Sequence, residues 1–313
     1  MKNKLSNTHL RIKPYIHNTP VLTSTQLNTL TNTNLYFKCE NFQKMGAFKM
    51  RGATNAILQL SEKDRKKGVV THSSGNFAQA VALAAKSLGV SATIVMPSNA
   101  PAVKIDAVKG YGGKVVLCPP TNEDRQKTAD AIVSETGATF LHPSNDLEVI
   151  LGQGTAALEL IEEVKTPLDA IVIPVGGGGL AAGTILATQA FSPTTKVYGG
   201  EPATVDDAYR SIKSGKIEYN TQLNTIADGL KTHLGDINFP IIMHGIAEII
   251  LVSEEEIIEA LKLLWSRLKI IVEPSCAVAF AAVLKDKKTF ENKEVGIVLS
   301  GGNVDFKTVF PLF

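Results

Sequence analysis

The chain has 313 residues, 44% of them apolar, so it can bury a large core and is not disordered as a whole. Its 32 lysines and arginines nearly balance its 30 aspartates and glutamates, which argues against a nucleic-acid or anionic-membrane partner and favours a small molecule. No apolar window approaches the ~18 residues of a membrane span. Cys39, Cys118 and Cys276 are too far apart for a CxxC metal site and suit a reducing cytoplasm.

Short runs rich in valine and isoleucine alternate with alanine-rich helical stretches, the pattern of βαβ units in a parallel sheet covered on both faces. The first block is expected to comprise strand and loop 68–76, helix 77–89, strand 92–97, helix 101–110, strand 114–119, helix 123–136 and strand 138–143. The second is expected to comprise a helix from Gly152 to about Val164, strand 170–175, a glycine run with an alanine-rich helix, strand 196–201, helix 254–271, segment 273–284 and strand 295–302. The sequence therefore predicts an α/β fold of two packed blocks with a cleft between them.

A run of four glycines at 176–179 stands between a predicted strand and a helix N-terminus, where bare backbone amides and the helix dipole suit a phosphate. A Walker loop would need lysine and then serine or threonine, but Leu180 and Ala181 follow. A dinucleotide site stays open, because the run matches G-x-G-x-x-A and Glu201 ends the next strand. A turn that merely allows close helix packing is the third interpretation.

Lys49 lies between Phe48 and Met50 in the string NFQKMGAFKMRGA. Partly apolar surroundings lower the pKa of a lysine and favour the free amine that an imine requires, whereas an ordinary surface cation is the alternative. Together with SSGNFAQA (73–80), GGGGLAAG (176–183) and SGGN (300–303), this string resembles, in order and over nearly the whole chain, the serine and threonine dehydratases of the β-family of pyridoxal-phosphate enzymes.

The resemblance implies a fold type II pyridoxal-phosphate enzyme, similar to the tryptophan synthase β subunit. It implies two domains, each an open, mostly parallel sheet with helices on both faces: a large cofactor domain of residues 1–67 and 148–313, and a small mobile domain of residues 68–147. Lys49 would hold pyridoxal 5'-phosphate as an imine and take the substrate α-proton from one face. The implied cofactor-binding residues are Phe48, Lys49, Asn76 at the phenolic oxygen, Gly176, Gly177, Gly178, Gly179 and Leu180 at the phosphate, and Ser300 at the pyridine nitrogen.

The loop Ser73, Ser74, Gly75 and Asn76 would bind the substrate. Racemising members of the family carry serine at the position of Ser74, whereas similar threonine dehydratases usually carry alanine, so Ser74 would be the catalytic acid/base on the face opposite the lysine. Some hydroxyaspartate dehydratases also have serine there, which leaves a spectator hydroxyl open. The sequence departs from the family at Phe77, where histidine is usual, and this change bears on the substrate range.

Two further sites are implied by the resemblance. Glu201, Asp207 and the carbonyl of Val205 match a structural cation site, and oxygen ligands of this kind suit Mg²⁺, Mn²⁺ or Ca²⁺, although two solvated carboxylates on a loop are the alternative. ATP, bound between subunits as an allosteric activator, is the second implied ligand. Its matched residues are Ser24, Thr25, Lys44, Gln79, Tyr111 and Asn303.

The resemblance thus implies a cytoplasmic homodimer that acts on a small amino acid, interconverts L- and D-serine, and also dehydrates serine to pyruvate and ammonia. The alternative is a dehydratase of threonine, serine or 3-hydroxyaspartate without significant racemase activity. Two other classes stay open at this point, a non-catalytic sensor with the cofactor fold and an NAD-dependent oxidoreductase. Retention of both Lys49 and Ser74 argues against the sensor.

Overall fold

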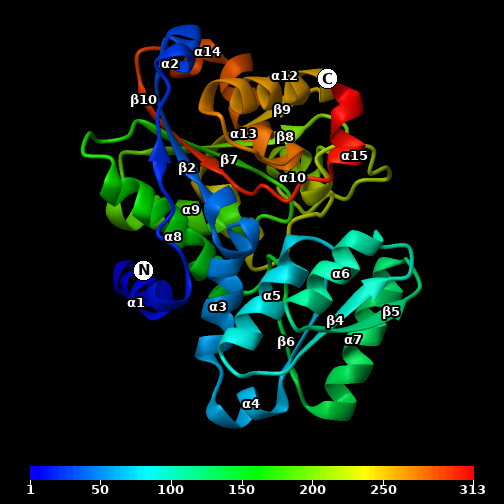
Figure 1. Ribbon diagram of the computed structural model, residues 1–313. Coiled ribbons are helices and arrows are strands. Elements are labelled where there is room, and N and C mark those ends of the chain that lie inside the picture. Colours follow the sequence, from blue (N-terminus) through cyan, green and yellow to red (C-terminus); the bar gives the residue numbers. More distant parts are fainter.

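The computed structural model describes residues 1–313, apart from the side chain of Asn122. Its strands are β1 (Val21–Leu22), β2 (Asn34–Cys39), β3 (Val69–His72), β4 (Ala92–Pro97), β5 (Lys114–Cys118), β6 (Thr139–Phe140), β7 (Ala170–Pro174), β8 (Lys196–Pro202), β9 (Ile246–Val252) and β10 (Glu294–Leu299). They form a larger sheet of order β1-β2-β10-β7-β8-β9 and a smaller one of order β5-β4-β3-β6 (Figure 1). Within the described residues β1 pairs antiparallel with β2 and the other strand pairs are parallel. The predicted α/β class with mostly parallel sheets is confirmed.

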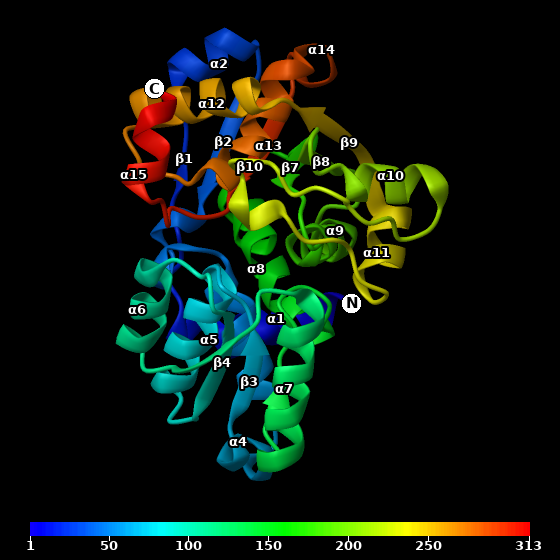
Figure 2. The ribbon, with the colours of Figure 1, turned by 90° about the vertical axis from the view of Figure 1, so that its right-hand side faces the viewer.

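Helices cover both faces of the larger sheet. The helices of the chain are α1 (Lys2–Ile12), α2 (Thr25–Thr31), α3 (Lys49–Gln59), α4 (Glu62–Lys67), α5 (Asn76–Ser87), α6 (Ala102–Gly110), α7 (Asn122–Thr136), α8 (Leu147–Glu163), α9 (Gly179–Phe191), α10 (Asp207–Ser214), α11 (Asn238–Gly245), α12 (Glu254–Leu263), α13 (Pro274–Lys285), α14 (Lys287–Phe290) and α15 (Phe306–Val309). Ala170 and Val172 of β7 pack with α13, whereas Ile171 and Ile173 pack with α8 and α9. Figure 2 shows α13 on one side of β7 and both α8 and α9 on the other. This alternation follows from the two-residue period of a strand.

The smaller sheet lies within residues 69–140 and has its own two packed faces. Ile94 and Met96 of β4 pack with α3 and α5, while Val95 packs with α7. Helix α3 also packs on α8, so it joins the two halves of the molecule. The domain boundaries at 67/68 and 147/148 stay a prediction.

Helix α8 begins at Leu147, five residues before the predicted start at Gly152, which was wrong. The side chain of Asp146 caps it by accepting hydrogen bonds from the amides of Glu148 and Val149. Glycine inside a helix weakens it, and for that reason Gly152 suggested a boundary.

The glycines of α8 allow three helices to approach backbone to backbone. A Cβ at Gly152 would lie 2.5 Å from the Cα of Gly52 in α3, and a Cβ at Gly154 would lie 2.6 Å from the carbonyl oxygen of Gly183 in α9. Helix α8 therefore packs directly against the main chain of both α3 and α9.

Two other expectations need correction. The predicted helix 254–271 ends as an α-helix at Leu263 and continues as a π-helical turn, Leu264–Leu268, and strand 138–143 is shortened to β6. Strands β1, β2 and β9 were not predicted. The remaining predicted strands and helices are found within a few residues of their expected ends.

A buried network of charges connects α3 with α8. Arg51 is fully buried, and its guanidinium donates to both oxygens of Glu40 at 2.7 Å and to those of Glu159 at 2.6 and 2.7 Å. Lys38 of β2, also fully buried, lies 2.9 Å from Glu159. Two cations thus face two buried carboxylates, so the charges balance.

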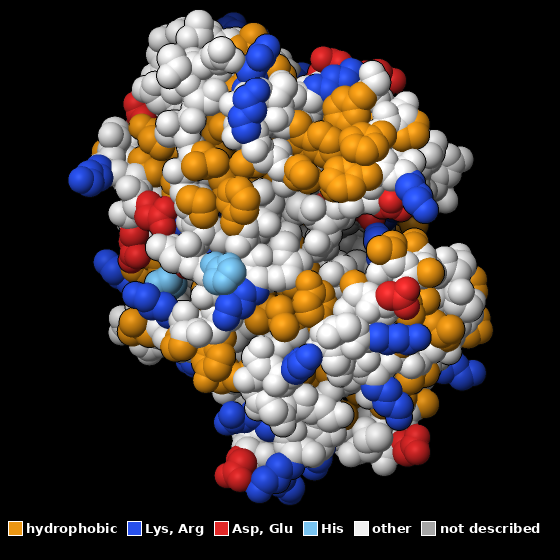
Figure 3. All heavy atoms as spheres, viewed as in Figure 1, with side chains coloured by type: hydrophobic (Ala, Val, Ile, Leu, Met, Phe, Trp, Pro, Cys, Tyr) orange, Lys and Arg blue, Asp and Glu red, His pale blue; other side chains and the backbone are white. Residues whose placement is uncertain are grey.

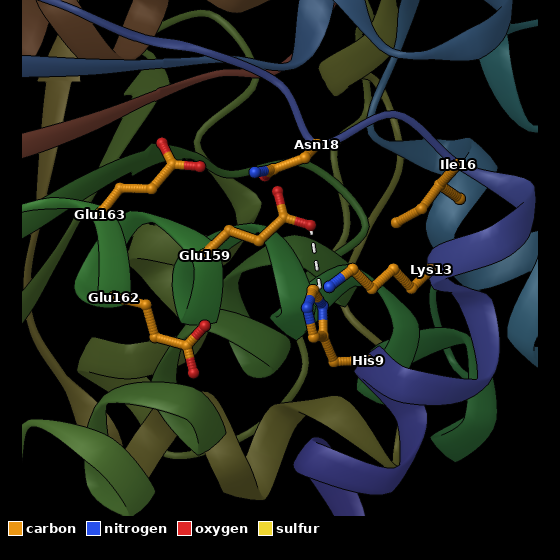
Figure 4. A pocket seen from close by; sticks show the side chains of 7 residues that line it. All are labelled: His9, Lys13, Ile16, Asn18, Glu159, Glu162 and Glu163. Carbon is orange, nitrogen blue, oxygen red and sulfur yellow. Dashed lines mark ion pairs between the residues drawn. The ribbon is translucent and has the colours of Figure 1, made fainter.

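A cavity of about 170 Å³ opens beside this network between α1 and α8 (Figure 4). Its lining residues are His9, Lys13, Ile16, Asn18, Glu159, Glu162 and Glu163. In Figure 4 His9 faces Glu159, and their nearest nitrogen and oxygen atoms are 3.7 Å apart. This cavity is distinct from the glycine loop that precedes α9.

Candidate active site

The glycine run forms the turn from β7 into α9, as the sequence predicted. Gly178 has a φ of 80°, and a Cβ there would lie 2.7 Å from a methyl group of Leu234 and 2.8 Å from Oδ1 of Asn238. A Cβ at Gly177 would lie 2.6 Å from Oγ of Ser144. Glycine is required here both by conformation and by space, and the free amides at the start of α9 provide a site for a phosphate.

Lys49 is the first residue of α3, and its Nζ donates a hydrogen bond to the carbonyl oxygen of Pro143 at 2.8 Å. The same Nζ lies 5.0 Å from the ring centre of Phe48 and 5.7 Å from that of Phe77. Burial lowers the pKa of Lys49 to about 8. The amine is therefore much more often neutral near pH 7 than that of a solvated lysine, as an imine-forming group requires.

Asn76 lies at the start of α5 and bridges three segments of the chain. Its Nδ2 donates to Glu273 at 2.9 Å, and its Oδ1 accepts from Asn303 at 2.9 Å. Glu273 is 5% exposed, and burial, assisted by the negative charge of Asp228, raises its pKa to about 8. Its neutral form is thus accessible at physiological pH. No role was predicted for Glu273, although a single acid within the apolar string IIVEPSCAV was a usable signal.

Ser300 is 4% exposed at the end of β10, and its carbonyl oxygen accepts a hydrogen bond from the amide of Phe48 at 3.0 Å. This bond places the end of β10 beside the residue that precedes Lys49. Leu180, in the first turn of α9, is also buried. The structure thus brings the start of α3 and the glycine loop together at the carboxyl end of the larger sheet, where β10 and β7 both end. Parallel strands with helical crossovers require this arrangement.

The predicted substrate loop connects β3 with α5. The amide of Gly75 donates to Oγ of Ser73 at 3.3 Å, and the amide of Ser73 donates to the carbonyl of Val95. Ser74 is partly exposed on this loop. Phe77 is 2% exposed, so the position at which the sequence departs from its family presents an apolar ring toward Lys49.

The segment between β6 and α8 closes the site and was not predicted to contribute to it. Nδ1 of His142 accepts hydrogen bonds from the amides of Ser144 at 3.2 Å and Asn145 at 2.8 Å. The side chain of Asn238 donates to the carbonyls of Ser144 at 3.0 Å and Gly177 at 2.9 Å. The segment is therefore bonded to the glycine loop while the carbonyl of its Pro143 holds Lys49.

Glu201, in β8, lies against the start of α10, whose first residue is Asp207, and both are 1% exposed. Glu201 accepts from the amides of Ala208 and Tyr209, and Asp207 accepts from Asn220. Burial raises the pKa of Glu201 well above its usual value, with a further contribution from the charge of Asp207, and burial raises the pKa of Asp207 to about 6. Oδ2 of Asp207 is buried without a hydrogen-bond partner, as expected of a cation ligand.

The residues predicted around a nucleotide are only partly brought together. Asn303 bonds Asn76 and the carbonyl of Met45, and Met45 packs in one apolar cluster with the ring of Tyr111. Lys44 directly precedes Met45, and Gln79 follows Asn76 on α5. Ser24 caps α2, followed by Thr25, and among the described residues no hydrogen bond joins these two side chains to the other four.

Comparison with known proteins identifies the class. A family model described as "Pyridoxal-phosphate dependent enzyme" matches residues 12–301, and the chain belongs to that family. A serine racemase of Dictyostelium discoideum is 50% identical over 311 residues, covering 97% of this chain and 95% of the relative. A beta-hydroxyaspartate dehydratase of Paracoccus denitrificans is 48% identical, with 95% and 94% coverage. The structure of maize serine racemase matches with a TM-score of 0.96 at 43% identity, covering 99% of this chain and 95% of that one.

Family membership favours pyridoxal phosphate over a dinucleotide as the cofactor, while the assignment of its phosphate to the glycine run stays a prediction. The residues present fit this cofactor, because among the described residues the amides of the glycine run donate no hydrogen bond and so are available to a phosphate, and Lys49 supplies an amine of lowered pKa. The chain is therefore a pyridoxal-phosphate-dependent enzyme and, since its relatives are racemases and ammonia-lyases, one of the amino-acid-converting kind. Among the described residues no helix is both long and apolar enough to cross a membrane.

Proposed function

We propose that this enzyme interconverts L- and D-serine and also dehydrates serine to pyruvate and ammonia. The observation that carries the proposal is Ser74. Within the part of the chain that the structure describes, Ser74 makes no hydrogen bond, so its hydroxyl is available on the loop that leads into Asn76. The relatives named serine racemase support the same substrate.

The bound cofactor withdraws electrons from the substrate α-carbon and thereby makes its proton acidic. Lys49, as a neutral amine, removes or returns that proton on one face. Ser74 serves the opposite face, because racemisation needs an acid or base on each side. The remaining predicted contacts bind and orient: Asn76 and Ser300 hold the cofactor ring, and the glycine loop with Leu180 holds its phosphate. Ser73 and Gly75 hold the substrate carboxylate.

Replacing Ser74 with alanine tests this assignment. Formation of D-serine from L-serine should fall ~10²–10⁴-fold, the usual effect of losing a positioned acid or base, while pyruvate formation from L-serine persists because it needs only the Lys49 face. Ser87→Ala, at an exposed serine later in α5, is the matched control. Unchanged racemisation in Ser74→Ala would make the hydroxyl a spectator.

The second candidate is a dehydratase of threonine, serine or 3-hydroxyaspartate without significant racemase activity. The 48% identical hydroxyaspartate dehydratase favours it. A chiral assay of wild-type products from serine, threonine, aspartate and 3-hydroxyaspartate separates the two candidates. Pyruvate without any D-serine would replace our proposal with the dehydratase.

We further propose a divalent cation, Mg²⁺, Mn²⁺ or Ca²⁺, at Glu201, Asp207 and the carbonyl of Val205. The orphaned oxygen of Asp207 and the raised pKa values of both carboxyls support it, because a cation would compensate their burial. For ATP as an activator, the support is that Asn303 donates a hydrogen bond to the carbonyl of Met45, the residue that follows Lys44. Addition of ATP in a rate assay tests that site directly.

We also propose a homodimer in the cytoplasm. An apolar patch near the C-terminus supports the dimer (Figure 3): Phe306, Phe310 and Phe313 are 40%, 60% and 50% exposed around Trp265. Contiguous exposed aromatic surface is typical of an interface. Three unpaired, buried cysteines fit a reducing compartment. The molar mass in solution, measured by light scattering, tests the dimer.

A further inference from the structure

His142 has a fixed pattern of protonation that the proposed reaction has not yet used. Its Nδ1 accepts hydrogen bonds from two backbone amides, those of Ser144 and Asn145. An imidazole nitrogen that accepts a hydrogen bond carries a lone pair, so the proton of the neutral ring resides on Nε2. The turn of the chain after β6 therefore selects one tautomer.

The ring is also held neutral. Burial lowers the pKa of His142 to about 4, and the positive charges of His72, Lys49 and His233 lower it further than the negative charge of Asp236 can offset. The ring of His72 has its centre 6.2 Å away, at an interplanar angle of 81°. His142 thus presents a neutral N–H donor at physiological pH rather than an imidazolium.

The Nε2–H of this ring is left for a ligand. Among the described residues it has no hydrogen-bond acceptor, and Nε2 is not one of the buried, unpartnered nitrogens, so it is accessible to solvent. The next residue, Pro143, holds Nζ of Lys49 through its carbonyl. The free N–H donor therefore belongs to His142, one residue before Pro143, whose carbonyl contacts the amine of Lys49.

The chemistry of the Nε2–H of His142 determines which ligand group it can bind. An N–H can bond only to an acceptor, so an oxygen is favoured there over a second donor. The substrates of the proposed function carry such an oxygen on the β-carbon or the carboxylate beyond it. An apolar side chain would leave the N–H unpaired, at a cost in free energy.

We propose that His142 donates its Nε2–H to the side-chain oxygen of the substrate and so selects α-amino acids with a polar oxygen at that position. The inference rests on the proposed function and deepens it. A neutral ring that lost its Nε2 proton would become an imidazolate, so His142 orients and polarises the carbon–oxygen bond and does not supply the proton that leaves with the hydroxyl. It is a substrate-contacting specificity residue, separate from the α-proton transfers of Lys49 and Ser74.

Two variants separate this role from a purely structural one. In His142→Asn the amide oxygen can still accept from the amides of Ser144 and Asn145, but no N–H reaches the position of Nε2. In His142→Gln the longer side chain can place an N–H near that position while losing the acceptor at Nδ1. His244→Asn is the matched control, because His244 is exposed and bonds only the carbonyl of Pro240 within the described residues.

The readout is a ratio measured on the holoenzyme: keto-acid formation from L-serine divided by exchange of the alanine α-proton in deuterated water. Alanine has no side-chain oxygen, so its exchange reports Lys49 and the cofactor alone. We expect His142→Asn to lower the ratio ~10- to 100-fold, the effect of one lost hydrogen bond to a developing charge, and His142→Gln to recover part of it. The ratio should be unchanged in His244→Asn.

If His142→Asn slows both reactions equally, the residue only holds the loop. If it slows neither reaction, the residue does not contact the substrate. Either result overturns the inference while leaving the proposed function standing. A wild-type enzyme that exchanges the alanine α-proton but neither racemises nor dehydrates serine would overturn the proposed function and this inference with it.

Discussion

Replacing Arg51 with methionine should destabilise the fold severely, although the change lies outside the cofactor site. Methionine is similar in length but removes the donors that pair Glu40 and Glu159, and both carboxylates are almost inaccessible to solvent, at 0% and 4% exposure. Lys38 still faces Glu159, at 2.9 Å, so Glu40 is the carboxylate left uncompensated.

Breaking a buried ion pair by removing one partner costs about 3–5 kcal/mol. For a chain of 313 residues, unfolding entropy of roughly 2.1 cal/mol/K per residue converts that loss into a fall of about 5–8 °C in melting temperature. Lys66→Met, at an exposed pair with Glu62, is the matched control and should stay within about 0.5 kcal/mol of wild type.

The loss should depend on pH with a defined sign. Burial would raise the pKa of Glu159, but the hydrogen bond and charge of Arg51 outweigh it and hold the pKa below its usual value. The stabilisation is thus present above the unfolded pKa and lost as pH falls through the folded one. We expect the difference between variant and wild type to be largest near pH 7 and to shrink below about pH 4.5 in thermal melts. A variant that melts within 1 °C of wild type at pH 7 would refute the electrostatic argument.

Three other perturbations address the cofactor and cation sites. Because the pKa of Lys49 is lowered to about 8, the rate at which the apoenzyme binds pyridoxal phosphate should rise with pH up to about 8 and then level off. Visible absorption measures this rate, and a rate that is constant from pH 6 to 9 would contradict the requirement for a free amine. Gly178→Ala, with a φ of 80° and a Cβ 2.7 Å from Leu234, should weaken cofactor retention at least ~10-fold in dialysis, and unchanged retention would argue against the loop as the phosphate site. Chelation of the cation should lower the melting temperature of the enzyme. Added Mg²⁺ should restore the melting temperature more at pH 8 than at pH 5.5, because the carboxyls of Glu201 and Asp207 must be deprotonated to bind a cation. Asp207→Ala should abolish the response to Mg²⁺.

The fold could be predicted where local signals agree. Helix α7 has Thr121 as its N-cap and Gly137, in the left-handed conformation, as its C-cap, and the expected range was correct within one residue at its start. Strand β2 was missed because Lys38 interrupts its apolar pattern, and the partner that allows this lysine to be buried, Glu159, is more than a hundred residues away. Long-range compensation of this kind leaves no local trace in the sequence.

The candidate site divides in the same way. Lys49, Asn76 and the glycine run could be proposed from ordered strings that also define local structure. Glu273 and His142 were missed because their chemistry arises from tertiary contacts, the bond with Asn76 in one case and the two amides of a turn in the other. A single acid in a sequence gives no indication of its burial, and a single histidine gives no indication of its burial or its tautomer.

The glycine contacts of α8 bring its main chain against the main chains of both α3, which begins at Lys49, and α9, which begins at the glycine loop. Side chains elsewhere can change size during evolution without altering a close approach between main-chain atoms. The span between imine carbon and phosphate in the ligand is equally invariant, being covalent. Enlarging this gap for a longer cofactor analogue would therefore require replacing glycines at the helix crossings, whereas ordinary repacking of the apolar core would leave it unchanged.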